Sequence, residues 1–144
     1  MAGSYKGACF CGAVQVEVTG DPVAMAYCHC RSCRSWSGSP IYAATIWPAA
    51  AVKVTSGADY VATFLKTPDS FSHRQYCSKC GGHLMSGHPT AGVVDVSAAT
   101  LPTLPFVASG HVHYAETVLP MKDGLPKFRD FPVDFGGSGE LVPE

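Results

Sequence analysis

Short apolar segments separated by glycine and proline make up most of this chain, and none keeps a helical period for three turns. Residues 14–19 alternate valine with polar side chains, which predicts a half-buried strand that ends at the Gly-Asp-Pro turn of residues 20–22. One short helical turn is predicted over residues 31–36. Further strands are predicted over residues 23–27, 41–47, 52–55, 60–65, 70–76, 93–97 and 106–114.

The composition agrees with this pattern. Of the 144 residues, 47% are hydrophobic and 15% are charged, and the chain contains 15 glycines and 11 prolines. Such a mixture favours short strands joined by tight turns over long helices, and it argues against disorder. We therefore predict an all-β protein with very little helix, in which residues 1–135 form a single domain and residues 136–144 form a loose C-terminal tail.

The charge balance narrows the choice of partners. Ten Lys and Arg residues face eleven Asp and Glu residues, so the net charge is −1 and no basic surface for nucleic acid is expected. The charge-free run of residues 35–52 is interrupted by Pro40 and Pro48, which argues against a membrane span. The first residues contain no apolar stretch typical of a secretory signal, so we expect a cytoplasmic protein with reduced thiols.

Cysteine supplies the strongest chemical signal in the sequence. The seven cysteines cannot all pair, and they are dense for a chain in a reducing compartment, so zinc is the expected use of their thiols. Four thiolates close a structural zinc site, whereas three leave one coordination position open for catalysis. The cysteines fall into three groups: Cys9 and Cys11; Cys28, Cys30 and Cys33; and Cys77 and Cys80.

The spacing leaves the partition of these ligands open. Cys9 and Cys11 can join Cys77 and Cys80 in a closed site, which would clamp the N-terminal strand to a much later turn. Alternatively, a member of the central group completes the Cys77 and Cys80 site, and Cys9 and Cys11 are ordinary buried thiols.

Several longer motifs resemble one known family. These are Gly-Ala-Cys-Phe-Cys-Gly-Ala-Val at residues 7–14, Tyr-Cys-His-Cys-Arg-Ser-Cys-Arg at 27–34, Arg-Gln-Tyr-Cys-Ser-Lys-Cys-Gly at 74–81 and Asp-Gly-Leu-Pro-Lys-Phe at 123–128. In this order they resemble the glutathione-dependent formaldehyde-activating enzyme family, which includes centromere protein V. The resemblance implies a small zinc-stabilised β-tent fold of packed antiparallel sheets.

The resemblance also implies a ligand assignment and an activity. Cys9, Cys11, Cys77 and Cys80 match the structural zinc site of the family, and Cys28, Cys30 and Cys33 match the catalytic zinc site. The implied activity is that of a zinc-dependent carbon–sulfur lyase or synthase, which forms S-hydroxymethylglutathione from glutathione and formaldehyde. The implied cofactors are two zinc ions per chain, and the implied partner is a small thiol such as glutathione.

Charged residues beside the cysteines are candidates for substrate contacts. A fourth thiolate on the catalytic zinc would need nearby cations, for which Arg31 and Arg34 are suited by position. Arg74 matches the family pattern and is a candidate for contact with an anionic substrate, with a surface or structural ion pair as the alternative. We assign Arg31 and Arg74 to the substrate-binding set. A homodimer is compatible with the sequence, which carries no signal for oligomeric state.

The remaining candidates have simpler expected roles. His29 is expected near the metal or at the surface rather than among its ligands, and His111 and His113 are expected to be half-buried on one face of a strand. Asp95 and Glu116 are candidate proton carriers, although each is expected to be solvated. Aromatic residues expected to build the core and pocket walls are Trp36, Tyr42, Trp47 and Phe71. The alternative function is a non-catalytic, zinc-stabilised binding module.

Overall fold

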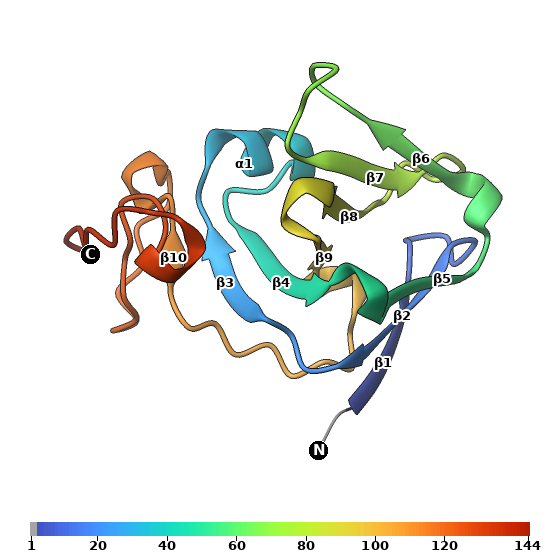
Figure 1. The fold of residues 1–144 in the computed structure, drawn as a ribbon, viewed down its shortest axis with the longest axis horizontal. Coiled ribbons are helices and arrows are strands. Elements are labelled where there is room, and N and C mark those ends of the chain that lie inside the picture. Colours follow the sequence, from blue (N-terminus) through green and yellow to red (C-terminus); the bar gives the residue numbers. More distant parts are fainter. Residues whose placement is uncertain (1–2) are drawn as a thin grey trace. The chain divides into compact units, whose positions relative to one another are not determined.

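The computed structural model describes residues 3–144 and divides the chain into two compact units. The first unit combines the chain up to Val23 with Thr45–Phe106, and the second combines Ala24–Ala44 with Val107–Glu144. Figure 1 labels the elements of both units. The strands are β1 (Gly3–Ala8), β2 (Gln15–Gly20), β3 (Ala24–Cys28), β4 (Tyr42–Pro48), β5 (Val52–Ser56), β6 (Val61–Phe64), β7 (His73–Cys77), β8 (His83–His88), β9 (Val93–Ser97) and β10 (His111–Val112).

Helical structure in the described residues is limited to one short α-helix and a few single turns. The helix is α1 (Arg31–Ser37). Short 3-10 turns occupy Ala49–Ala51, Ala58–Tyr60, Pro89–Ala91, Ala98–Thr100, Tyr114–Glu116 and Val133–Phe135. Within residues 3–144, no helix combines the length and the apolar character that crossing a membrane requires. The prediction of a mostly β protein with very little helix is confirmed.

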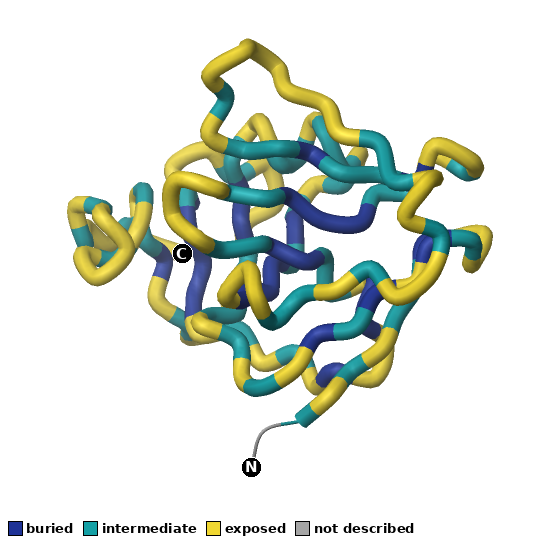
Figure 2. The backbone as a smooth tube through the Cα atoms, turned by 45° about the vertical axis from the view of Figure 1, so that its right-hand side comes forward, coloured by how far each residue is buried: buried dark blue, intermediate teal, exposed yellow. Residues whose placement is uncertain are grey.

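The first unit contains two sets of antiparallel strands. The strand β2 pairs with β1 on one side and with β5 on the other. The other set runs in the order β9, β8, β7 and β6, with each strand antiparallel to its neighbour. Along β2, the buried residues Val16 and Val18 alternate with more exposed polar ones, as the sequence pattern predicts. Figure 2 shows how buried and exposed stretches follow one another along the strands.

A buried tryptophan links β4 to β9 in the core of the first unit. Trp47 is completely buried, and its indole Nε1 donates a hydrogen bond of 2.9 Å to Thr45 Oγ1. The hydroxyl of Thr45 in turn donates to the carbonyl oxygen of Val96, at 2.6 Å. Both buried polar groups are thereby satisfied, which removes the cost of burying them.

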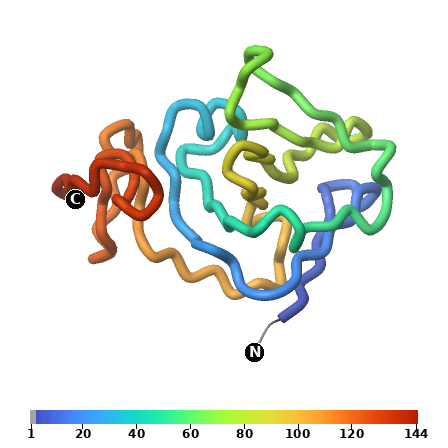
Figure 3. The backbone as a smooth tube through the Cα atoms, viewed as in Figure 1, coloured from blue at the N-terminus to red at the C-terminus, as the bar shows by residue number. Residues whose placement is uncertain are grey.

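The second unit places a parallel strand pair beside α1. In it, β3 pairs with β10, and His111 lies opposite Tyr27. This pair is parallel, whereas the pairs described above are antiparallel. Figure 3 shows the orange and red C-terminal part of the chain beside the light-blue segment that contains β3 and α1. The helix begins after Cys30, whose Sγ accepts the backbone N–H of Cys33 at 3.2 Å, and it ends at Gly38 with φ of 67°.

The sequence pattern locates most strands and misses two. It does not predict β1 (Gly3–Ala8), because small and polar residues there hide the alternation. It also misses β8 (His83–His88), where Ser86 is buried and Gly87 carries no side chain. Conversely, the strand predicted over residues 106–114 is reduced to His111–Val112, since the rest of that segment is irregular.

The C-terminal residues contact another segment of the second unit. Val142 N donates to the carbonyl oxygen of Lys127 at 2.9 Å, and Leu141 forms a bridge with Phe128. The Glu144 carboxylate accepts a hydrogen bond from Lys127 Nζ at 2.9 Å. Residues 140–144 are therefore tied to the segment 123–129. The boundary between a domain over residues 1–135 and a tail stays a prediction.

Replacement of Gly7 by alanine tests the close packing of β1. A Cβ atom at Gly7 would lie 1.7 Å from the carbonyl oxygen of Thr100, so the backbone must shift. We expect Gly7→Ala to lower the free energy of unfolding by about 2–3 kcal/mol, measured by urea denaturation. Gly87→Ala is the matched control, because its Cβ would make an ordinary contact at 3.9 Å with His73 Cβ. Equal stability of the two variants would contradict this packing.

Candidate metal centres

Four cysteine sulfurs of the first unit converge on one point. Cys9 and Cys11 follow β1, Cys77 ends β7, and Cys80 lies in the turn before β8. The Sγ atoms of all four lie within 4.8 Å of one another. The Sγ of Cys11 lies 3.6 Å from that of Cys9 and 3.9 Å from that of Cys77.

These separations suit a tetrahedral zinc ion. Sulfur lies about 2.3 Å from zinc, so two ligands of a regular tetrahedron are separated by about 3.8 Å. The two Sγ–Sγ distances above lie on either side of this value. The four-cysteine cluster therefore fits a closed metal site, and four sulfur donors in this arrangement are typical of zinc or iron–sulfur sites.

Backbone amides stabilise negative charge on this cluster. The N–H of Val14 donates to Cys9 Sγ, and the N–H of Gly82 donates to Cys80 Sγ, each at 3.3 Å. Burial opposes ionisation of Cys9, but the Val14 amide and the neighbouring thiols lower its pKa to about 6. The Gly82 amide likewise lowers the pKa of Cys80. These contacts favour the thiolate form of Cys9 and lower the cost of ionising Cys80.

The second unit brings the other three cysteines together. Cys28 ends β3, Cys30 caps α1, and Cys33 lies in the first turn of that helix. Their Sγ atoms also lie within 4.8 Å of one another, with Cys28 buried and the other two partly exposed. The structure thus groups the seven cysteines as four and three, which is the first of the two partitions that the spacing left open.

Negative charge in the three-cysteine cluster concentrates on Cys30. Hydrogen bonds from the thiols of Cys28 and Cys33, together with the Cys33 amide, lower the pKa of Cys30 to about 2. Hydrogen bonds with Cys30 and Cys33, together with burial, raise the pKa of Cys28. Negative charge is thus favoured on Cys30 and opposed on Cys28, and a divalent cation bound by the cluster would favour the thiolate form of its ligands.

Charged side chains of the second unit surround the N-terminal end of α1. The Glu116 carboxylate accepts the N–H of Arg31 at 3.1 Å, and Arg34 Nη2 donates to the Glu116 carbonyl oxygen at 3.2 Å. Arg34 Nε also donates to the carbonyl oxygen of His29 at 2.9 Å. Arg34 therefore holds the cysteine loop by its backbone, while Arg31 is exposed to solvent.

The histidine at position 113 differs from the expectation. His113 has φ of 51°, and no other non-glycine residue among residues 3–144 has a positive φ. It lies beyond the end of β10. The prediction that His113 shares a strand face with His111 is therefore wrong. Its Nδ1 lies 3.5 Å from the carboxylate of Glu116. Strained backbone of this kind is typical of functional loops.

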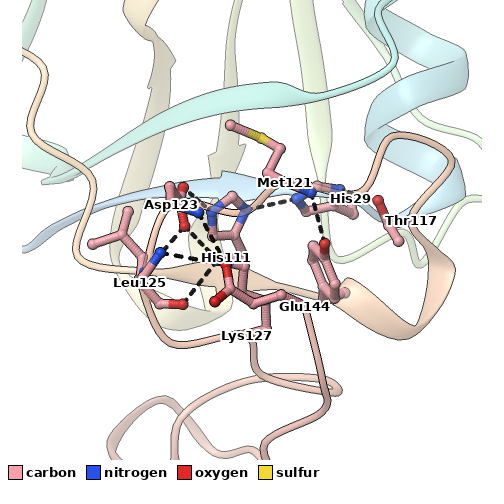
Figure 4. A network of polar contacts seen from close by, with 10 residues as sticks. His29, His111, Thr117, Met121, Asp123, Leu125, Lys127 and Glu144 are labelled. Carbon is pink, nitrogen blue, oxygen red and sulfur yellow. Dashed lines mark hydrogen bonds and ion pairs between the residues drawn. The ribbon is translucent and has the colours of Figure 1, made fainter.

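A network of polar groups around two buried histidines extends away from the cysteine loop (Figure 4). His29 and His111 are both fully buried, and His29 Nε2 lies 2.8 Å from His111 Nδ1. Thr117 Oγ1 lies 2.8 Å from His29 Nδ1, and Asp123 Oδ2 lies 2.7 Å from His111 Nε2. Burial and the nearby His111 lower the pKa of His29 to about 4. The lysine Lys127 pairs with Asp123 and, together with His111, lowers the pKa of that carboxyl group.

No local sequence pattern connects these residues. His29 and His111 are 82 positions apart, and Asp123 and Lys127 appeared only within a motif of the family resemblance. His111 is fully buried rather than half-buried. The signal that was available is the Asp-x-x-x-Lys spacing at residues 123–127, which places a carboxylate next to a cation, but many surface segments share it.

Two further predictions about single residues are wrong. Asp95 is buried in β9, where solvation was expected. The aromatic ring of Phe71 is 57% exposed and stacks on His88 rather than building the core, whereas Trp47 and Tyr42 are buried as predicted. Arg74 is buried in β7 and donates from Nη1 to Ser86 Oγ at 3.0 Å. A role for Arg74 in substrate binding stays a prediction.

The fold and the two clusters define a mostly β protein that presents two preformed sets of thiol ligands. Residues 4–116 match the model of the family described as glutathione-dependent formaldehyde-activating enzyme. The chain belongs to this family, as the sequence motifs predicted.

Individual proteins that resemble the chain include a curated relative and a protein of known structure. An uncharacterized lyase of Schizosaccharomyces pombe is 29% identical over 77 residues, which are 54% of this chain and 53% of that protein. The match thus spans about half the length of this curated relative. The crystal structure of a Rhodobacter sphaeroides protein superimposes with a TM-score of 0.57 at 22% identity, covering 69% of this chain and 90% of the other. This second likeness concerns the fold alone.

Serine substitutions test the different roles of the two clusters. We expect Cys77→Ser to lose one metal ion per chain and more than about 3 kcal/mol of stability, because binding at a closed site contributes to folding. We expect Cys33→Ser to lose one metal ion with little change in stability, because its cluster holds one short loop. Elemental analysis and thermal unfolding measure both effects. Retention of full metal content by either variant would exclude that cluster as a metal site.

Proposed function

We propose that this protein is a zinc-dependent carbon–sulfur lyase or synthase that joins a small thiol such as glutathione to an aldehyde such as formaldehyde. The observation that carries the proposal is the cluster of Cys28, Cys30 and Cys33, which is separate from the four-cysteine set. Three protein thiolates leave one tetrahedral position of a zinc ion for an incoming ligand. Membership of the family favours a thiol and an aldehyde as the reactants.

The three-cysteine cluster suits zinc by its donor type, and zinc bound there would stabilise a substrate thiol as its thiolate at neutral pH. The residues of this chain hold the cluster in place. Arg34 fixes the carbonyl oxygen of His29 and thereby the backbone between the first two cysteines. Arg31, exposed in the first turn of α1, is placed to attract the carboxylates of a glutathione-like thiol.

The proposed reaction is redox-neutral. The thiol sulfur forms a bond with the carbonyl carbon, the carbonyl π electrons move to oxygen, and the proton lost from sulfur ends on that oxygen. The reverse reaction breaks the same carbon–sulfur bond. No oxidant, reductant or further co-reactant is needed, which agrees with a protein that supplies only thiolates, cations and hydrogen-bond partners around its cluster.

The four-cysteine cluster has a different proposed role. Four thiolates leave no coordination position for a substrate, so we assign it a second, structural zinc ion. A binding module without catalysis would need only this closed site, and the additional three-thiol cluster therefore favours the enzyme. A cytoplasmic location, a homodimer, and the absence of nucleic-acid and membrane partners remain predictions of the sequence.

The activity is best measured at equilibrium, because thiols and formaldehyde also combine without a catalyst. Carbon-13 exchange NMR on labelled formaldehyde and glutathione reports the rate at which the hydrate and the thiol adduct interconvert. We expect the wild-type protein with zinc to accelerate this exchange and Cys33→Ser to lose at least about 100-fold of the acceleration.

Arg31→Gln separates binding from chemistry in the same assay. We expect it to raise the glutathione concentration needed for half-maximal exchange by about five- to tenfold while the limiting rate changes little, because Arg31 acts on the remote carboxylates. With 2-mercaptoethanol, which has no carboxylate, the variant should equal the wild type. An unchanged exchange rate in Cys33→Ser would overturn the proposed function.

A further inference from the structure

His113 lies where the chain changes direction after β10. The strand ends at Val112, and His113 has φ of 51° and ψ of 37°. In a continued strand every second side chain points to the same face, so His113 would follow His111 into the interior. The left-handed backbone conformation interrupts this alternation. His111 is accordingly fully buried, whereas the side chain of His113 is 27% exposed.

The turn that follows brings a carboxylate to the ring of His113. The N–H of Glu116 donates to the carbonyl oxygen of His113 at 3.0 Å, which closes a tight turn. The Nδ1 atom of His113 lies 3.5 Å from Glu116 Oε2. The ring also packs edge-to-face against Phe131, with the ring centroids 4.5 Å apart. A carboxylate and an aromatic ring thus hold this partly exposed imidazole.

Glu116 connects the same turn to the cysteine loop. Its Oε1 atom accepts the N–H of Arg31, the residue that follows Cys30, at 3.1 Å. Its carbonyl oxygen accepts a hydrogen bond from Arg34 Nη2 at 3.2 Å. The carboxylate that contacts His113 is therefore also fixed to the first turn of α1.

Two further observations place His113 close to the three-cysteine cluster. In the pairing of β10 with β3, Val112 lies opposite Cys28, so His113 follows directly on the partner of a cluster member. Hydrogen bonds from the thiols of Cys28 and Cys33 are the main cause of the lowered pKa of Cys30, and a positive charge on His113 lowers it further. Such an electrostatic contribution through space requires that the ring lie near the sulfur of Cys30.

The other charged groups around this turn are used elsewhere. Arg34 donates to two backbone carbonyl oxygens. Asp130 accepts the N–H of His113 with its carbonyl oxygen, but its carboxylate accepts hydrogen bonds from Ser138. Within residues 3–144, Glu116 is the carboxylate at ion-pair distance from the ring of His113.

The contact with Glu116 fixes how the ring is presented. A carboxylate only accepts hydrogen bonds, so Nδ1 of His113 carries the proton that faces Glu116. In the neutral ring, Nε2 is then an unprotonated acceptor. Nε2 of His113 has no hydrogen-bond partner among residues 3–144. An imidazole with one nitrogen oriented by a carboxylate and the other free is typical of a general acid–base catalyst.

We propose that His113 moves the proton in the reaction at the three-cysteine cluster and that Glu116 is its positioning residue. This inference rests on the proposed function. As the carbon–sulfur bond forms, Nε2 of His113 takes the proton that leaves the thiol sulfur and then gives it to the oxygen of the former carbonyl group. The imidazole ends neutral, as it began. In the reverse direction, Nε2 takes the hydroxyl proton and returns it to sulfur as the carbon–sulfur bond breaks.

The test removes the imidazole without straining the turn. Asparagine and glycine both tolerate positive φ, so His113→Asn and His113→Gly suit this position. We expect each zinc-loaded variant to lose about 100-fold of the limiting acceleration in the carbon-13 exchange assay. Zinc content, thermal stability and the glutathione concentration for half-maximal exchange should stay close to those of the wild type. His73→Asn, which removes an imidazole from β7, is the matched control and should exchange at the wild-type rate.

Glu116→Gln tests the positioning of the ring. The variant keeps a side-chain oxygen for the N–H of Arg31 but removes the negative charge that favours a proton on Nδ1 of His113. We expect a limiting exchange rate about tenfold lower and, in ¹⁵N-histidine spectra, a shift of the His113 proton from Nδ1 towards Nε2. A merely structural role of Glu116 would leave the position of this proton unchanged.

Two results would overturn the inference. One is a His113→Asn or His113→Gly protein that keeps the limiting exchange rate of the wild type, even when it needs more glutathione. The other is a wild type whose neutral His113 carries its proton on Nε2, which is read without any variant and decides the matter when neither variant folds. Failure of the proposed function has a different signature, because the zinc-loaded wild type would then leave the exchange at its uncatalysed rate, and the inference would fail with it.

Discussion

The convergence of sulfur atoms at the spacing of tetrahedral metal ligands is the constraint on which the rest of the structure depends. In the first unit, this spacing connects the turn after β1 with the turn before β8, two segments that are far apart in the sequence. Thiolates brought this close repel one another unless a cation binds between them. A metal ion bound by the four-cysteine cluster would therefore couple metal binding to the folding of this unit.

The three-cysteine cluster is built differently, within a single loop and the first turn of α1. Its environment is polar: Arg34 holds the loop backbone, and Glu116 accepts the N–H of Arg31. Beside the loop, the two buried histidines are hydrogen-bonded to each other, and His111 also contacts Asp123, whose side chain is partly exposed; such a network orders the buried rings. Under the proposed function, a closed cluster that stabilises the fold and an open cluster that binds the substrate thiol together account for the seven cysteines.

Local features of the sequence were sufficient to predict many of the strands and the three groups of cysteines. Short strands with clear alternation, such as β2 and β9, could be located because their apolar faces repeat every second residue. The ligand groups were visible because their members lie within a few positions of one another. Their division into four and three depended on the family resemblance, since sequence spacing alone allows Cys77 and Cys80 to take other partners.

What could not be predicted depends on contacts between distant residues. The pairing of His29 with His111, the burial of Asp95 and the exposure of Phe71 follow from the tertiary fold, and no local pattern marks them. The strand β8 was missed because Ser86 and Gly87 interrupt its apolar pattern, although the pairing with β7 and β9 satisfies its backbone.

The central claim is that the two clusters are metal sites of unequal character. Native mass spectrometry of the reduced, zinc-loaded protein during a titration with chelator tests it most directly. The account predicts two zinc ions per folded chain, of which the first is removed while the protein keeps the compact charge-state distribution of its folded form, and the second leaves only as the chain unfolds. A single zinc ion per chain, or two ions that leave together, would contradict it.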